Sequence, residues 1–543
     1  MSGNRGRIRA HMACEPCRER KKKCDGKQPC SLCVRFGYAC SFGSCHRKRR
    51  HFERGSPSAS PPPAMAASKE ASNFEARVSS TEANSGAAFV RNFGLHFESP
   101  NTQRLQTFAW NVGRNKSFVS KAASSFMEIV PKTKLMELVH FYFGKFHPYF
   151  GFIDRDGFMR RLEAKWMNST PEEPFDAIVS GVAAMGYLFS RRDGCVPEAQ
   201  FVETSRVIIE LNSASGPPSI DIITALLLRV AYLRMTDSPY PAWMASCTLM
   251  HMIELSDLHI EPTSAKILEQ LTEPCDPNTR RRLFGIAQYL HLWMAFELRQ
   301  SGVPLHRFHF PLPLPSPGDY TSEVLSLLSL SESLSPEHSK DSQELEITIS
   351  KVLSSVFIHS ASTVAQCNLT LCIYRRLRAL NCNPTPQIYD QMFKLMTKAL
   401  ALVRELVASC CPWHGTASVS FQIVCTLLVM NDHETTSYLE DAMNTLRTIH
   451  AVYDTEVMKE TYRIACMLIA MQYRRKENDL NLLKTVVLSH SAVAIDKSNP
   501  VLATQTAPSS SEPSWLGDLV SDINGFSAFD LEQFFNSDFS ALP

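Results

Sequence analysis

Six of the 17 cysteines in this chain lie between positions 14 and 40. They form two copies of one spacing, in which a Cys-x2-Cys pair is followed by a third cysteine seven positions after the second. The two copies comprise Cys14, Cys17 and Cys24, and then Cys30, Cys33 and Cys40. Thiolates at such short spacing are ligands for borderline and soft metal ions, so the repeat predicts two equivalent metal sites.

Zinc suits this donor set best, because structural zinc is tetrahedral and readily bound by sulfur alone. Each copy supplies three thiolates, one fewer than a tetrahedral ion needs. Both ions reach four ligands when two of the six sulfurs bridge them, which predicts two Zn²⁺ per chain. The alternatives are a disulfide-stapled module and a metal-storage or redox-sensing cysteine protein. The N-terminus has no apolar signal segment, which favours a reducing compartment and disfavours disulfides.

Basic residues fill the first half of the cysteine repeat. Residues 1–54 carry 15 Lys and Arg against 4 Asp and Glu, a net charge of +11, whereas the rest of the chain carries −9. A short helix between zinc ligands can place Lys and Arg against guanine edges and phosphates in a DNA groove. A solvated face or an import signal would be the simpler interpretation of an isolated basic run, but the enclosing cysteines favour DNA binding. A second basic run, residues 46–51, could contact flanking phosphates or direct nuclear import.

The segment resembles the DNA-binding module of the fungal zinc binuclear cluster (Zn2Cys6) transcription factors. All six cysteines match, as does the Asp25-Gly26 pair, while Pro29 is displaced by one position. The resemblance implies a nuclear protein that binds double-stranded DNA, with Cys14 and Cys30 as the bridging ligands. It also implies that Lys21 contacts a CGG triplet, that Lys22 is a second base-contacting residue, and that phosphates are met by Arg18, Arg20 and Lys23.

Residues 55–125 contain no sustained heptads and include the proline-rich run 61–63. This composition is typical of a linker, so a coiled coil directly after the cysteines is not expected. A single module that contacts three base pairs needs additional discrimination. Two arrangements stay open, a monomer aided by the second basic run and a homodimer through the large body.

From about residue 126 to residue 495, apolar residues recur at helical spacing. Examples are Leu135, Leu138, Tyr142 and Phe146, and later Met392, Leu395, Ala399, Leu402 and Leu406. These patterns predict an all-α region. We expect Ser219 to cap a helix that begins near Ile220. The proline- and serine-rich stretch 311–342 predicts an excursion between two helical halves.

The first half of this region resembles the middle homology region of the same family. The likeness is carried by residues 142–154, 222–228 and 279–284, and it implies a regulatory role. An enzyme is not predicted, because the chain lacks a P-loop, a dinucleotide-binding glycine motif, a nucleophile elbow and a His-Glu-x-x-His motif. No apolar run is long enough to span a membrane. The body's scattered polar groups are expected to be structural: His140, His147, His291, Arg280–Arg282 and Cys410–Cys411.

The C-terminal residues 496–543 interleave carboxylates with aromatic and aliphatic side chains, and no Lys or Arg follows Lys497. Such a composition is typical of a disordered acidic activation segment that meets a coactivator groove. A helix docked on the body is the alternative. The predicted contact residues are Trp515, Leu519, Phe526, Phe529, Phe534, Phe535 and Phe539.

The sequence therefore predicts a multidomain transcription factor. Its expected parts are a basic tail (1–13), a Zn2Cys6 module (14–40), a basic run and disordered linker (41–125), a helical regulatory region (126–495) and an acidic-aromatic activation segment (496–543). Activation at RNA polymerase II promoters is favoured over repression. The pathway stays open between a secondary-metabolite gene cluster and primary carbon or nitrogen metabolism or stress.

Overall fold

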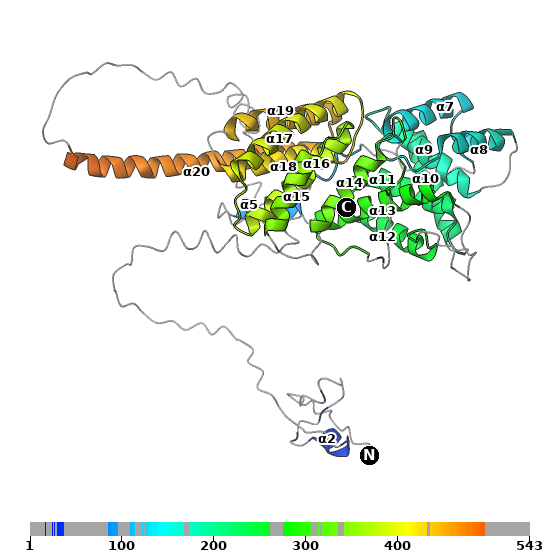
Figure 1. Cartoon of the computed structure of the whole chain (residues 1–543), viewed down its shortest axis with the longest axis horizontal. Coiled ribbons are helices and arrows are strands. Elements are labelled where there is room, and N and C mark those ends of the chain that lie inside the picture. Colours follow the sequence, from blue (N-terminus) through cyan, green and yellow to red (C-terminus); the bar gives the residue numbers. More distant parts are fainter. Residues whose placement is uncertain are drawn as a thin grey trace, which may run out of the picture. The chain divides into compact units, whose positions relative to one another are not determined.

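The computed structural model describes residues 17, 24, 27, 30–36, 85–95, 109–114, 122, 125–167, 173–213, 216–260, 275–303, 305, 312–314, 316–334, 342–431 and 435–494. The chain divides into two compact units, Met1–Ala66 and Ala67–Pro543. Within the described ranges every regular element is a helix and no strand occurs, which confirms the predicted all-α body (Figure 1).

The first unit contains the short helix α2 (Ser31–Phe36). The second unit contains, in chain order, α5 (Gly86–Leu95), α6 (Phe126–Ile129), α7 (Lys132–Phe141), the π-helical turn η2 (Tyr142–Phe146), α8 (Arg155–Met167), α9 (Pro174–Leu188), α10 (Val196–Ser213), α11 (Ile220–Thr236), α12 (Pro239–Leu255), α13 (Pro277–Leu298), α14 (Thr321–Ser331), the 3₁₀ turn η3 (Glu332–Leu334), α15 (Ser342–Ser354), α16 (Ser360–Ala379), α17 (Pro386–Ala408), α18 (Gly415–Met430), α19 (Thr435–Tyr453) and α20 (Glu456–Ala494).

Helix α9 is the central element of the first half of the body. Every side chain from Phe175 to Leu188 is buried, because α7, α10 and α11 pack around the helix. Its start is fixed by Pro174 at the first helical position and by a capping box between Glu173 and Asp176. Gly186 brings α9 against the backbone carbonyl of Leu138 in α7, where a larger residue would collide with main-chain atoms.

Helices α16 and α18 are the central elements of the second half of the body. Residues 416–428 of α18 are all buried, and α5, α16, α17, α19 and α20 pack against the helix. The stripe predicted along α17 is also confirmed, since Met392, Leu395, Ala399 and Leu406 are buried and Leu402 is partly buried. An amphipathic helix needs a partner for its apolar face, and here that partner is the pair α16 and α19.

An aromatic cluster joins the two halves. Trp413, just before α18, stacks on Phe146 at a centroid distance of 5.5 Å and meets the edge of Tyr149 at 4.8 Å. Phe146 and Tyr149 belong to the motif 142–154 that resembled the middle homology region, and both are buried. The motif therefore contributes core packing at the contact between the halves.

Helix starts were predictable where a capping residue stands before an apolar run. The Ser219 side chain accepts a hydrogen bond from the N–H of Ile222, and α11 begins at Ile220 as expected. The cap satisfies one of the amide groups that a helix start leaves without an internal partner.

Two parts of the region 41–125, which we predicted as disordered linker, are folded instead. Helix α5 packs on α18, and the segment 109–114 is buried against α11 and the start of α20. The Asn111 side chain donates to the carbonyls of Arg234 and Asp237, and the Thr455 hydroxyl donates to the carbonyl of Val112. The prediction failed because these pieces are short, and single buried residues such as Trp110 leave no periodic signal.

The excursion predicted over 311–342 is also partly wrong. Helix α14 lies within it and packs against α13 and α16, with Val324, Leu325 and Leu327 buried in the common core. Serines on this helix bond to its own backbone: Ser331 donates to the carbonyl of Leu327. Serine content was misleading because buried serines can satisfy their hydroxyls within the helix.

The residues 37–84 and 495–543 lie outside the described part of the chain, and with them the basic run, most of the predicted linker and the predicted activation segment. Among the described helices, none combines the length and apolar character that crossing a bilayer requires.

Candidate metal centre and the polar anchors of the body

Three cysteine sulfurs meet in the first unit. The Sγ atoms of Cys17, Cys30 and Cys33 all lie within 4.8 Å of one another, and each side chain is buried. The Cys17 and Cys30 sulfurs are 3.6 Å apart. Two thiolates on one tetrahedral zinc, with Zn–S bonds of about 2.3 Å, are separated by roughly 3.8 Å. The donor set and its spacing therefore fit zinc.

Helix α2 positions two of these sulfurs. Cys30 stands directly before the helix, and the N–H of Cys33 donates to the Cys30 sulfur over 3.4 Å. The N–H of Val34 closes the first turn on the Cys30 carbonyl at 3.0 Å. This turn explains the Cys-x2-Cys spacing, because it aims both side chains at one point while the backbone donates to a thiolate.

The structure brings together cysteines from both copies of the repeat, Cys17 from the first and Cys30 and Cys33 from the second. Cys24 is half-buried and packs against this cluster. The other predicted site residues lie outside the described part of the unit: Cys14, Arg18, Arg20, Lys21, Lys22, Lys23 and Cys40.

The histidines that could have been ligands in the body have structural surroundings. His291 is buried and stacked on Trp243. Its Nε2 accepts the N–H of Val303 at 2.8 Å, so Nδ1 carries the proton and donates to the Ser246 hydroxyl at 3.1 Å. Burial lowers the pKa of His291 to about 4, assisted by the nearby His251. His147 is held neutral in the same way, with a pKa of about 4 due mainly to burial, whereas His140 is exposed.

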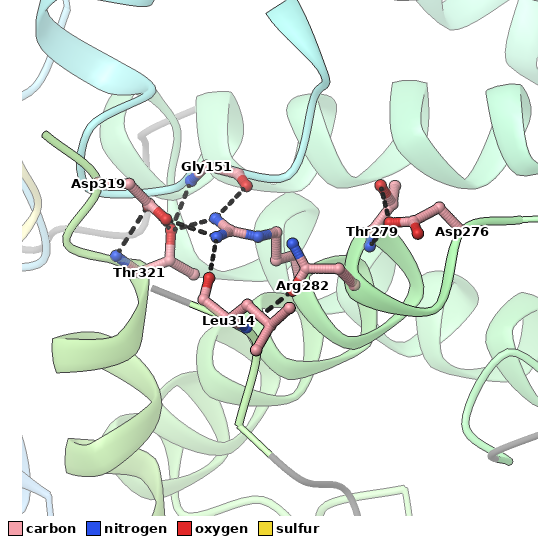
Figure 2. A network of polar contacts seen from close by, with 8 residues as sticks. Gly151, Asp276, Thr279, Arg282, Leu314, Asp319 and Thr321 are labelled. Atoms are coloured by element: carbon pink, nitrogen blue, oxygen red, sulfur yellow. Dashed lines mark hydrogen bonds and ion pairs between the residues drawn. The ribbon is translucent and has the colours of Figure 1, made fainter. Parts of the chain in front are cut away.

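Arg282 links three segments that are distant in sequence. Figure 2 shows its guanidinium reaching the carbonyls of Gly151 and Leu314, each at 2.9 Å, and the Asp319 carboxylate at 2.6 Å. Burial raises the pKa of Asp319, but hydrogen bonds from Arg282 and Thr321 outweigh that effect and hold it below its usual value. The Asp319 carboxylate therefore stays charged and anchors the approach to α14.

The first arginine of this run, Arg280, anchors the turn after α12. Arg280 donates to the carbonyls of Asp257 and Ile260, at 2.6 and 2.9 Å. The structural role predicted for the arginine run is thus confirmed for Arg280, which bonds to backbone carbonyls, and for Arg282, which also forms an ion pair.

A second polar anchor was not predicted. Arg234 in α11 is 1% exposed, pairs with the Glu297 carboxylate at 2.6 Å and donates to the Trp110 carbonyl at 2.6 Å. Its guanidinium carbon lies 3.6 Å from the centroid of the Trp110 ring. The residues come from three distant segments, so no local pattern could have revealed the contact.

Comparison with known proteins gives a consistent result. Residues 12–50 match the fungal Zn(2)-Cys(6) binuclear cluster domain, and residues 139–404 match the fungal specific transcription factor domain. The chain is 36% identical to Protein RDR1 of Gibberella zeae, over 98% of this chain and 99% of that protein.

Two further relatives carry functional names. Transcription factor kojR of Aspergillus oryzae is 30% identical over 94% of this chain and 91% of that protein. The citrinin biosynthesis transcriptional activator mrl3 of Monascus ruber is 25% identical over 53% and 60%. The cysteine cluster fits zinc, the described body is helical, both family domains match, and the similarity to Protein RDR1 extends over nearly the full length. The chain therefore belongs to the Zn2Cys6 family of fungal transcription factors.

Proposed function

We propose that this protein is a nuclear activator that binds CGG-containing promoter DNA through a two-zinc cluster and controls one biosynthetic gene cluster. The observation that carries the proposal is the convergence of Cys17, Cys30 and Cys33 from two separate repeats. A buried sulfur cluster in a strongly basic 54-residue segment suits a small DNA-binding module, because zinc supplies the folding energy that so short a chain lacks.

In the proposed cluster, the six cysteines would hold two Zn²⁺ ions, with Cys14 and Cys30 shared between the ions and Cys17, Cys24, Cys33 and Cys40 completing the coordination. The position of Cys30 supports its role, because its sulfur lies close to a ligand from each repeat. Two ions and six thiolates leave a charge of about −2, which the neighbouring cations offset.

The cations between Cys17 and Cys24 are assigned two kinds of contact. Lys21 donates to guanine, with Lys22 beside it, whereas Arg18, Arg20 and Lys23 bind phosphates. Base contacts set sequence preference and phosphate contacts set affinity, so the two groups predict different mutant phenotypes.

The experiment compares binding of the zinc-loaded full chain to a CGG duplex and to a scrambled duplex at fixed salt. Lys21→Ala is expected to lower the preference for CGG by about ten-fold, or about 1.4 kcal/mol, which lies within the range of about 1–3 kcal/mol for one base contact. Lys23→Ala is the matched control and is expected to weaken binding to both duplexes equally. An unchanged preference in Lys21→Ala would show that the base-contact assignment is incorrect.

The pathway proposal is supported by the relatives, one of which is named an activator of citrinin biosynthesis. Genome-wide occupancy of the tagged protein tests it directly. We expect sites confined to one locus of co-regulated genes whose transcripts fall in the Lys21→Ala strain. Occupancy spread over catabolic or stress genes would contradict a dedicated role.

The proposal assigns the activating contact to residues 496–543, where carboxylates keep Trp515, Leu519, Phe526, Phe529, Phe534, Phe535 and Phe539 available to a coactivator. Whether the chain acts on DNA as a monomer or as a homodimer through its body follows from the half-site arrangement in the occupied promoters.

A further inference from the structure

Helix α20 has two halves of different character. Its first half packs against α18 and α19, and residues 464–469 are buried. From Tyr473 to His490 every side chain is exposed, and the helix extends beyond the bundle (Figure 1). We call residues 473–494 the distal half of α20.

The distal half is rich in large apolar side chains. Six of them lie within nine residues and are 51–74% exposed: Leu480, Leu482, Leu483, Val486, Val487 and Leu488. At 100° per residue, Leu480, Leu483, Val486 and Val487 fall on one side of the helix, and Asn481 and Thr485 on the other, whereas Leu482 and Leu488 lie off the apolar side. A contiguous exposed apolar surface of this kind marks an interaction site.

The charge of the distal half indicates what this surface binds. Arg474, Arg475, Lys476 and Lys484 are exposed on it, against two carboxylates, Glu477 and Asp479. A partner that combines apolar side chains with negative charge would meet both features. The same chain contains such a segment shortly after the helix ends.

The segment 512–539 carries six carboxylates and no Lys or Arg, and it contains one tryptophan and five phenylalanines. Its aromatic side chains are apolar, like the exposed leucines and valines of the distal half, and its negative charge is opposite to that of the basic residues there. A second copy of the distal half fits less well, because it has no acidic cluster to face Arg474, Arg475 and Lys476.

The lengths are also compatible. The 22 residues of the distal half span about 33 Å as a helix. The 25 residues 515–539 would span about 38 Å as a helix, and the intervening residues 495–514 reach up to about 65 Å when extended. The chain can therefore reverse after α20 and lay this segment along the whole exposed face.

We propose that the distal half of α20 is the docking surface for the acidic-aromatic segment of the same chain. Its apolar face covers the aromatic side chains, and Lys476 on that face and Arg475 at its edge pair with the carboxylates. The regulatory part of this inference rests on the proposed function: a coactivator must displace the segment from α20 before activation.

Hydrogen exchange of the zinc-loaded full chain tests the contact without reference to transcription. In the variant Leu480→Glu/Leu483→Glu we expect amides of the distal half to exchange at least ten-fold faster than in the wild type. The control Asn481→Glu/Thr485→Glu adds the same charge on the opposite side and should exchange like the wild type. Replacement of Phe534, Phe535 and Phe539 by serine should accelerate exchange in α20 as the leucine variant does.

Three outcomes would overturn the proposal. Exchange in α20 that is unaffected by the phenylalanine substitutions would mean that the segment does not cover the helix. Protection that disappears on ten-fold dilution, together with a doubled mass in solution, would identify a second copy as the occupant. Equal acceleration in the leucine variant and its control would mean that added charge, not loss of the apolar face, caused the effect.

A transcription reporter separates failure of this inference from failure of the proposed function. If the phenylalanine variant loses reporter activity while hydrogen exchange in α20 is unchanged, the result would support the activating role of the segment and contradict its docking on α20. If docking holds and the segment activates, Leu480→Glu/Leu483→Glu should raise reporter output several-fold at equal DNA occupancy. Unchanged output with accelerated exchange would keep the contact and reject its regulatory meaning.

Discussion

Replacement of Arg234 by methionine should destabilise the helical body strongly. Arg234 is buried, and its guanidinium is bonded both to the Glu297 carboxylate and to the Trp110 carbonyl. Methionine fills much of the same space but leaves Glu297 in the core without its cation. Burial already raises the pKa of Glu297, and the charge and hydrogen bonds of Arg234 oppose that rise.

The magnitude follows from the partner left behind. Removing one member of a buried ion pair costs about 3–5 kcal/mol, because the remaining charge must be desolvated or neutralised. For a body of roughly 370 residues, with about 2.1 cal/mol/K of unfolding entropy per residue, this corresponds to a fall in melting temperature of about 4–6 °C. Part of the loss belongs to the Trp110 carbonyl, which loses a donor in the same substitution.

The double variant Arg234→Met/Glu297→Leu is the matched control. It removes both charges, and we expect it to recover at least half of the lost melting temperature, because no buried carboxylate is left without a partner. Thermal melts of the full chain at pH 7, followed by far-ultraviolet circular dichroism, supply the comparison. A double variant less stable than Arg234→Met would refute the reasoning, since the loss would then come from packing and not from the unpaired charge.

Three further predictions concern close packing, protonation and metal binding. Gly186→Ala should lower stability by about 1–3 kcal/mol because its methyl group meets the Leu138 backbone, whereas Gly144→Ala enters open space and should be neutral or stabilising in thermal melts. His291 has a pKa of about 4 in the folded protein and about 6.5 in the unfolded chain. Its neutral form therefore contributes fully to the free energy of unfolding above pH 6.5, and about 3 kcal/mol of that free energy is lost as the pH falls toward 4. The pH dependence of unfolding should be shallower in His291→Gln, and an identical curve would contradict this assignment. Cys30→Ser should remove both zinc ions as measured by elemental analysis, while Cys195→Ser in the body retains two; two ions in Cys30→Ser would disprove bridging.

The meeting of Cys17, Cys30 and Cys33 was predictable because cysteine spacing is local information. A Cys-x2-Cys pair fixes two thiolates within one helical turn, and the repeated spacing indicates two halves of one module. The helical class of the body and the cap at Ser219 were predictable for the same reason, since 3.6-residue periodicity and capping residues act within a few positions.

Contacts between distant segments were not predictable in this way. Serine and proline content placed residues 321–334 in an excursion, yet apolar side chains at helical spacing bury α14 in the core. Residues 109–114 resembled a linker because six residues carry no periodic pattern. Their position is decided by the Arg234 carbonyl on α11, which accepts from Asn111, and by the Thr455 hydroxyl just before α20, which donates to the Val112 carbonyl. The histidines, too, were ambiguous until their ring partners were known.

The sequence by itself determined the cysteine spacing that brings Cys17, Cys30 and Cys33 together, the charge division between residues 1–54 and the rest of the chain, and the α-helical class, because each depends on residue type and spacing within one segment. Tertiary structure alone decided the Arg234–Glu297–Trp110 anchor, the burial of α14 and the exposure of the distal half of α20. The physical reason is that the burial of a side chain depends on two segments. An apolar stripe has the same sequence pattern whether another helix covers it, as on α17, or no described helix covers it, as on the distal half of α20.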